Sequence, residues 1–253
     1  MSLRVVHQRV VEPGAQAAWP AHAAVLRDTK GCLEAGVYRS LDDPERLALV
    51  ELWEDDGAFG RAWGELLTAG SPPPGLASGP PEGAAGDGWV SEFYRHGYTD
   101  RASGNWLPAG RADEAWRVAW PARGQVRVVV QTSTRPTQEE PWPGGVEALL
   151  ETRREPGCLQ FEVFAGVEFE QDGLLLELWE DQSRYDAHWR LRTRVREAGG
   201  AGGGGGGARP VQHERGQGDN GVEFYRHQQF VHLYDRWLPA APEAWSDTVA
   251  WPD

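Results

Sequence analysis

Two blocks of sequence occur twice in this chain, in the same order. Leu52-Trp53-Glu54-Asp55 returns as Leu178-Trp179-Glu180-Asp181, and Glu92-Phe93-Tyr94-Arg95-His96 returns as Glu223-Phe224-Tyr225-Arg226-His227. In both cases the second copy follows the first by about half the length of the 253-residue chain. A unit of that length is too long for a solenoid repeat and suits a whole small domain. The duplication therefore predicts two copies of one domain, fused head to tail.

The block order also predicts where the two domains end. Further tryptophan-containing blocks align at the ends of the two halves, so we expect domains at residues 1–122 and 123–253, each with a tryptophan-rich tail. A stretch rich in Gly, or in Gly and Pro, follows the second predicted helix of each copy, at residues 71–88 and 198–221. Such stretches bury too little apolar surface to offset their ordering entropy. We interpret both as loops inside a domain, because a further strand follows each of them.

Composition excludes some classes of partner. A formal net charge of −13 argues against nucleic acid or an anionic membrane surface, because both reward clustered Lys and Arg. No apolar run approaches the ~18 residues of a spanning helix. The two cysteines, Cys32 and Cys158, occupy equivalent positions and offer no disulfide framework. We therefore expect a cytoplasmic protein. The 13 tryptophans serve either as core packing or as walls for a flat aromatic ligand.

Hydrophobic periodicity predicts the same order of elements in each copy: strand, helix, strand, strand, helix, strand. Turn residues between the second and third strands indicate a hairpin. Acidic residues directly after the third strand suit the start of the second helix. The expected elements are 3–10, 20–29, 33–39, 47–53, 57–67 and 90–98 in copy one, and 126–132, 146–154, 159–165, 174–179, 183–196 and 222–230 in copy two.

Copy two resembles the antibiotic biosynthesis monooxygenase family. The resemblance rests on Glu155-Pro156-Gly157-Cys158-Leu159, on the strand ending in Trp179-Glu180-Asp181, and on the Ala187-His188 pair that follows. Copy one resembles the family less closely, because Thr29-Lys30-Gly31-Cys32 replaces the first motif and Ala62 stands where His188 does. The resemblance implies an α+β fold of two tandem ferredoxin-like (βαββαβ) domains that form an intramolecular dimeric α/β barrel. It also implies a monomer with an internal pseudo-dimer, or a homodimer of such chains.

The sequence contains no motif that binds a metal, a flavin or a phosphate. Its seven histidines are scattered and the glycine run lacks a phosphate-loop ending, so we expect no cofactor. The catalytic candidates are therefore acid–base groups of the fourth strand, where a His could take a phenolic proton and an Arg could stabilise the anion. These groups also fit a packing role, as strand residues that stack and pair. The candidates are His227, His96, Tyr225 and Arg226.

Aromatic residues and one histidine are the candidates for binding a substrate. Packing or capping is the alternative role for each of these residues: Trp179, Trp189, His188, Trp53, Trp63 and Tyr94. The family resemblance implies a cofactor-independent monooxygenase that oxidises a polycyclic aromatic or quinol-type, polyketide-like metabolite. The alternatives are a non-catalytic binding or cyclase-like protein for such a molecule, and a stress-associated domain without turnover. Copy two keeps more of the family pattern, so we expect it to be the active half.

Overall fold

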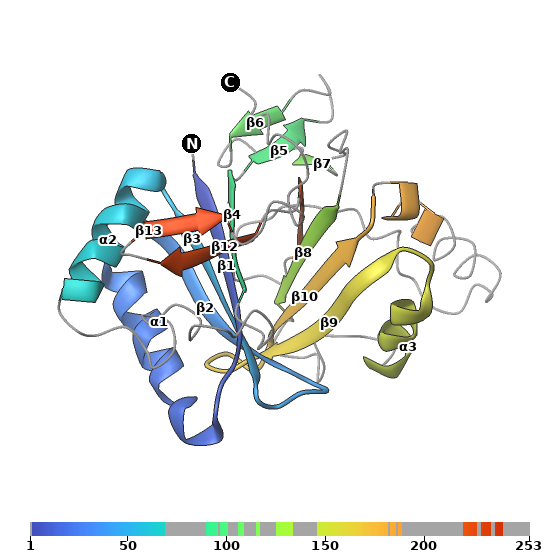
Figure 1. Cartoon of the computed structure of the whole chain (residues 1–253), viewed down its shortest axis with the longest axis horizontal. Helices are drawn as coiled ribbons and strands as arrows, with labels where there is room; N and C mark the ends of the chain where they lie inside the picture. The colour runs from blue at the N-terminus through green and yellow to red at the C-terminus, as the bar shows by residue number, and fades with distance from the viewer. Residues whose placement is uncertain are drawn as a thin grey trace. The chain divides into compact units, whose positions relative to one another are not determined.

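The computed structural model of the chain is shown in Figure 1. The chain folds into two compact units. Unit one comprises Met1–Gly97, Phe164–Gly173 and Gln228–Trp245, and unit two the remainder of the chain. The described residues are 2–68, 90–95, 97–100, 106–108, 115–116, 125–133, 146–181, 183–185, 187–188, 220–226, 229–233 and 236–239.

Unit one contains the first ferredoxin-like copy. Its strands follow the antiparallel order β2-β3-β1-β4, and helices α1 and α2 lie on one side of them (Figure 1). The bounds are β1 Leu3–Val10, a 3-10 turn Pro13–Ala15, α1 Ala18–Asp28, β2 Cys32–Ser40, β3 Arg46–Trp53, α2 Asp56–Thr68 and β4 Val90–Arg95. This confirms the predicted βαββαβ order in copy one.

Unit two contains the second copy, with the matching order β9-β10-β8-β11. The predicted helix at 146–154 is a short α-helix followed by a 3-10 turn. The bounds are β8 Val126–Ser133, α3 Val146–Leu150, a 3-10 turn Glu151–Arg154, β9 Cys158–Gly166, β10 Asp172–Trp179 and β11 Asn220–Arg226, with helical residues at 183–185 and 187–188. A small sheet of β5 Gly97–Asp100, β6 Trp106–Pro108 and β7 Ala115–Trp116 has the order β6-β5-β7.

The compact units do not coincide with the two sequence copies. The turn after β9, although it belongs to copy two, lies in unit one, where the end of β9 pairs with β2 at Tyr38↔Gly166 and Ser40↔Phe164. The strands β12 Gln229–Leu233 and β13 Arg236–Pro239 also extend unit one, because β12 pairs with β4. The predicted boundary at residues 122 and 123 lies outside the described residues and stays a prediction. So does closure of the two copies into one barrel.

The register of the strands shows that both copies are built alike. Arg4 of β1 opposes Tyr94 of β4, and Arg127 of β8 opposes Tyr225 of β11. Because opposed residues share a face and successive residues alternate, each sheet has a helix-covered face and an opposite face. On the helix-covered face of copy one a core cluster packs against α1 and α2. It includes Leu3, Val5, Trp19, Ala23, Leu26, Val37, Leu47, Leu49, Trp53, Ala58, Phe59 and Ala62.

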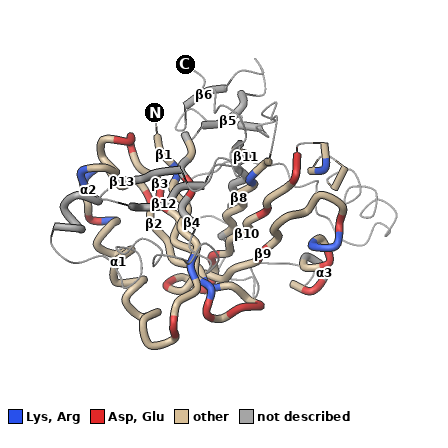
Figure 2. Tube along the Cα trace, viewed as in Figure 1, with Lys and Arg blue, Asp and Glu red and all other residues tan. Residues whose placement is uncertain are grey.

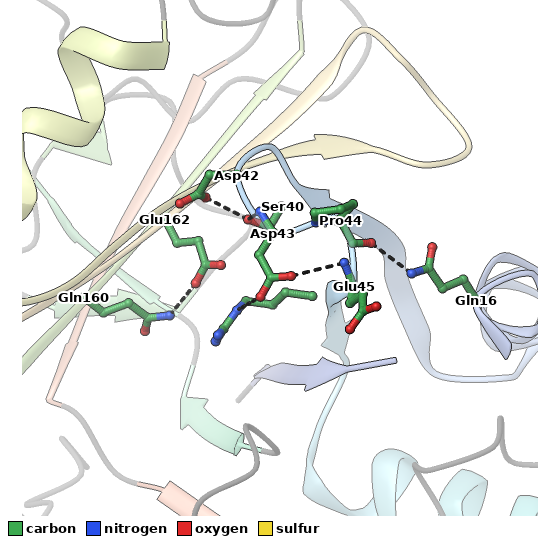
Figure 3. Close-up of polar contacts among 9 residues, drawn as sticks. Gln16, Ser40, Asp42, Asp43, Pro44, Glu45, Gln160 and Glu162 are labelled. Atoms are coloured by element: carbon green, nitrogen blue, oxygen red, sulfur yellow. Dashed lines mark hydrogen bonds and ion pairs between the residues drawn. The ribbon is translucent and has the colours of Figure 1, made fainter. Parts of the chain in front are cut away.

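Side-chain hydrogen bonds hold the turn that joins β2 to β3 (Figure 3). Ser40 Oγ donates to Asp42 Oδ1 over 3.0 Å and accepts from the backbone N–H of Asp43 over 3.3 Å. Gln16 Nε2 donates to the carbonyl of Pro44 over 2.9 Å and so ties the chain before α1 to this turn. The turn confirms the hairpin that the sequence Asp42-Asp43-Pro44 predicts.

Most charged positions of the described chain lie at turns and helix ends (Figure 2).

Candidate functional site

Several predicted site residues lie wholly or partly outside the described residues. His96, His227 and Trp189 are not described, and only the backbone of Trp63 and Arg226 is. Their proposed roles therefore stay predictions. The remaining candidates, which are buried, are Trp53, Tyr94, Trp179, His188 and Tyr225.

The tyrosine of the fourth strand and the tryptophan of the third strand face opposite ways in copy one. Leu3 opposes Trp53, whereas its neighbour Arg4 opposes Tyr94, so Trp53 and Tyr94 lie on opposite faces of the sheet. Tyr94 donates its hydroxyl to Glu92 Oε2 over 2.8 Å on the face away from the helices. The predicted site of copy one is therefore divided between two faces.

Copy two divides its candidates in the same way. Tyr225 opposes Arg127, the equivalent of Arg4, while Arg226 opposes Val126. By strand alternation His227 would share the face of Tyr225, and Arg226 would share that of Val126. His227 lies outside the described residues, so the expectation that His and Arg of this strand face different sides stays a prediction.

The structure brings two of the predicted residues together in copy two, in a group that we call the second core. The rings of Trp179 and His188 lie 4.8 Å apart between centroids, at an interplanar angle of 34°. Tyr185 and Phe161 flank the histidine, with centroid distances of 6.2 and 6.4 Å. The second core comprises Glu155, Phe161, Glu177, Trp179, Tyr185 and His188.

Two carboxylates orient the aromatic rings of the second core. Glu155 Oε2 lies 2.8 Å from Nδ1 of His188, whose side chain is 6 % exposed. This contact assigns the Nδ1 proton to the ring, because an ionised carboxylate can only accept. The indole N–H of Trp179 donates to Glu177 Oε2 over 2.7 Å. Burial, followed by the charges of Glu177 and Glu155, raises the pKa of the Cys158 thiol to about 11.

Copy one has a polar group on the equivalent face, which we call the first core. It comprises His7, Trp19, His22, Glu51 and Trp53, none of which is more than 5 % exposed. Glu51 Oε2 accepts the indole N–H of Trp53 over 2.6 Å. Its other oxygen, Oε1, lies 3.4 Å from His7 Nε2, which is within ion-pair range although the alignment is poor for a hydrogen bond. A fully buried carboxylate is thus held by an indole and an imidazole.

The charge of Glu51 affects the pKa of His22, a residue of α1. Burial lowers the pKa of His22, and the charge of His7 adds to this effect, whereas Glu51 opposes it. Burial also raises the pKa of Cys32 to about 12, with the Glu51 charge as the next cause. Both shifts favour the neutral forms of His22 and Cys32.

The basic groups occupy different positions in the two cores. Copy two places His188 on its second helix, where copy one has Ala62. Copy one instead places His7 on β1, at the register position that Val130 holds in β8. The sequence prediction missed Glu51, although Glu-Leu-Trp occurs in both copies and residues two apart on a strand share a face.

Two further properties follow from the described residues. None of the described residues forms a group of three or more His, Cys, Asp or Glu side chains suited to hold a metal ion. No helix in the described part of the chain has both the length and the apolar character needed to cross a membrane.

A family model described as antibiotic biosynthesis monooxygenase matches residues 3–64 and 125–193, together just over half of the chain. The chain belongs to this family. The two matched segments correspond to the two copies, which confirms the tandem arrangement and the ferredoxin-like α+β fold. Membership of the antibiotic biosynthesis monooxygenase family supports a monooxygenase type of function.

The solved structures to which this chain is similar are distant in sequence. An aldoxime dehydratase is 12% identical at a TM-score of 0.43, with 79% of this chain and 78% of that chain covered. An anthrone oxidase-like protein is 13% identical at a TM-score of 0.28, with 98% and 97% covered. A conserved protein from Methanosarcina mazei Go1 is 24% identical at a TM-score of 0.27, with 38% and 92% covered. No curated protein sequence matches this member of the antibiotic biosynthesis monooxygenase family.

Proposed function

We propose that the chain is a cofactor-independent monooxygenase for a polycyclic aromatic or quinol-type, polyketide-like metabolite. One observation carries the proposal: in the second core a buried histidine is oriented by a carboxylate and lies against an indole. Glu155 holds Nδ1 of His188 at 2.8 Å, and Trp179 lies 4.8 Å from the imidazole. A base, an orienting group and an aromatic surface are thus present within one compact unit.

The chemistry needs only a base and dioxygen. Glu155 orients the imidazole of His188 through Nδ1, and this imidazole would accept a proton from an acidic C–H or O–H of the substrate. The resulting anion can reduce dioxygen itself. For an anthrone, the CH2 group becomes a carbonyl, one oxygen atom enters the product, and the other leaves as water with the two hydrogens.

Oxygen uptake with a panel of anthrones and hydroquinones, without added flavin or metal, tests this proposal. His188→Gln should lower kcat by about 100-fold or more, since that is the usual contribution of a general base. Glu155→Gln should lower kcat less, because it keeps the orienting contact without the charge. Unchanged uptake in His188→Gln would exclude this residue as the base.

His227 and His96 remain predicted bases of the fourth strand, and the same assay compares them with His188. Strand alternation predicts that His227 lies on the face away from the helices, so its substitution should leave kcat unchanged if His188 is the base. Loss of kcat in His227→Gln with normal turnover in His188→Gln would transfer the role to the strand residue. Trp189, Trp63 and Arg226 are then tested as substrate contacts through KM.

Full burial of the two candidates Trp53 and Trp179 favours a second function, a non-catalytic binding or cyclase-like protein. Trp53 and Trp179 are 0% exposed, and each donates its N–H to a carboxylate, which is typical of a packing role. Tight binding of an aromatic ligand without oxygen uptake would support this second function.

We also propose a cytoplasmic monomer with an internal pseudo-dimer. Light scattering coupled to gel filtration tests the monomer by its mass.

A further inference from the structure

The turn that joins β9 to β10 belongs to copy two in sequence but contacts copy one in the structure. Its residues, Phe164–Gly173, are part of unit one. The end of β9 pairs with β2, and beyond it the backbone N–H of Val167 donates to the carbonyl of Val37 over 2.9 Å. The side chain of Val167 packs against the core cluster of copy one. We call residues 167–169 the tip of copy two.

Arg27, in the last turn of α1, holds this tip with its guanidinium group. Nη1 and Nη2 donate to the two carboxylate oxygens of Glu168 over 2.9 and 2.6 Å. The guanidinium carbon also lies 5.9 Å from the ring centroid of Phe169. Nη1 donates in addition to the carbonyl of Ala35 in β2 over 2.9 Å, which fixes the group beside the strand. A bidentate carboxylate contact and an aromatic ring together recognise both charge and shape.

The duplication separates the tip contact from the other contact of Arg27. Arg153 is the equivalent arginine of copy two, and its Nε donates to the carbonyl of Phe161, the equivalent of Ala35, over 2.6 Å. The bond from this arginine to the second strand is therefore common to both copies. That bond accounts for an arginine at this position, but not for the acidic and aromatic residues of the tip that Arg27 contacts.

The turns of the two copies differ at the positions that contact Arg27. In the alignment of the copies, Glu168 and Phe169 stand where copy one has Asp42 and Asp43. The carboxylate of Asp43 accepts from the backbone N–H of Glu45 over 3.2 Å, so it bonds within its own turn (Figure 3). Copy one therefore has neither the longer acidic side chain nor the aromatic ring at these positions, and the tip distinguishes copy two from copy one.

We propose that Arg27 and the adjoining part of β2 form a docking site that selects the tip of copy two, and that this site accepts the tip of a second copy of the chain as well as its own. The contacts are the same from either source, so the effective concentration of the chain's own tip decides between them. Dilute protein is then the monomer proposed above, whereas concentrated protein exchanges tips reciprocally between two chains. The site pairs copy one with copy two rather than with a second copy one.

Charge reversal on the two sides of the contact tests the exchange. Arg27→Glu gives a chain whose site and tip are both acidic, and Glu168→Arg gives a chain whose site and tip are both basic. Each variant repels its own tip, but in an equimolar mixture every site can meet a tip of opposite charge. Light scattering coupled to gel filtration should show twice the monomer mass for the mixture. Each variant alone, and the variant with both reversals in one chain, should keep the monomer mass. A mixture that keeps the monomer mass would overturn the proposal.

Hydrogen exchange at the Val167 amide measures docking directly. Docking protects this amide through its bond to β2. Its exchange should be about tenfold faster in Arg27→Glu, in Glu168→Arg and in Phe169→Asp, which gives the tip the residue of copy one. The variant with both charge reversals should return to the wild-type rate, and the amide of Glu180 in copy two is the control that should not change. Wild-type protection in all three variants, or protection that the double reversal does not restore, would contradict the selection of the tip by charge. Neither measurement depends on the proposed monooxygenase activity.

Discussion

Replacement of Gly31 by alanine should destabilise the protein more than the same replacement at Gly157. The two glycines are equivalent in the duplication and have positive φ values of +90° and +85°. Both glycines accept a backbone hydrogen bond from the residue that follows the third strand of their copy. The carbonyl of Gly31 accepts from the N–H of Glu54 over 2.9 Å, and the carbonyl of Gly157 accepts from the N–H of Glu180 over 2.8 Å. The backbone cost of a side chain is therefore similar at the two sites, about 1–2 kcal/mol.

The surroundings of the new Cβ atom make the difference. At Gly31 the Cβ would lie 2.6 Å from Ala58 Cβ, a residue of α2 that is 2% exposed, so relief requires a shift of the helix. At Gly157 the Cβ would lie 2.4 Å from Cγ and 2.8 Å from Cβ of Arg184. A change of rotamer relieves the contact with Cγ, because this side chain is 48% exposed, whereas the contact with Cβ requires a backbone shift that is smaller than the one needed at Gly31. Overpacking against a helix adds about 1–3 kcal/mol at Gly31 and less at Gly157, so the expected losses are about 2–5 kcal/mol for Gly31→Ala and about 1–3 kcal/mol for Gly157→Ala.

Urea unfolding followed by tryptophan fluorescence measures both losses. With an m-value shared by the wild type and the variants, the shift of the midpoint gives the change in the free energy of unfolding. If the two halves unfold in separate transitions, each variant should shift its own transition first. Equal losses, or a larger loss for Gly157→Ala, would refute the argument, since they would mean that α2 yields as easily as the Arg184 side chain.

Two further predictions concern a partly exposed ion pair and the thiols. Arg27 donates to both carboxylate oxygens of Glu168 over 2.6 and 2.9 Å, so Arg27→Ala should cost about 1–2 kcal/mol after allowance for its partial exposure. A double-mutant cycle with Glu168→Ala should show about 1 kcal/mol of coupling, and zero coupling would contradict the contact. Burial raises the pKa of Cys32 to about 12 and that of Cys158 to about 11, so both should react slowly with a disulfide reagent at pH 8 until urea unfolds the chain. Because the unfolded thiols lose their protons first, stability should fall as the pH rises from about 9 to about 12, and rapid labelling of the folded protein would contradict this.

The first three predicted strands of each copy agree closely with the described ones, because their signal is local. The fourth strands, predicted at 90–98 and 222–230, are each interrupted, since β4 ends at Arg95 before β5 and β11 ends at Arg226 before β12. Alternating apolar residues and turn residues predicted a strand at 47–53, which is observed at Arg46–Trp53, and one at 174–179, which is observed at Asp172–Trp179. The helix expected at 146–154 is less regular and ends in a 3-10 turn before Pro156. Proline disfavours helix in the residue before it, which accounts for the end but not for the tightening of the last turn.

The candidate site was predicted in part. The sequence singled out Trp179 and His188, and the structure places their rings in contact. It did not indicate that Glu155 would orient the histidine, because the two residues are far apart in sequence and meet only through the fold. Nor did it favour His7 and His22, since neither belongs to a repeated motif and their significance depends on burial beside Glu51.

The sequence by itself determined the duplication, the order of elements in each copy and the family, because these properties reside in repeated blocks and in hydrophobic periodicity. The tertiary structure decided which of these residues meet. A strand pattern says which residues share a face, but register decides what opposes them, so Trp53 and Tyr94 lie on opposite faces although both belong to repeated motifs. The tertiary structure also decided which polar groups are buried. It brings a carboxylate, two imidazoles and two indoles into the first core, where a missing hydrogen-bond partner has an energetic cost that it would not have in water.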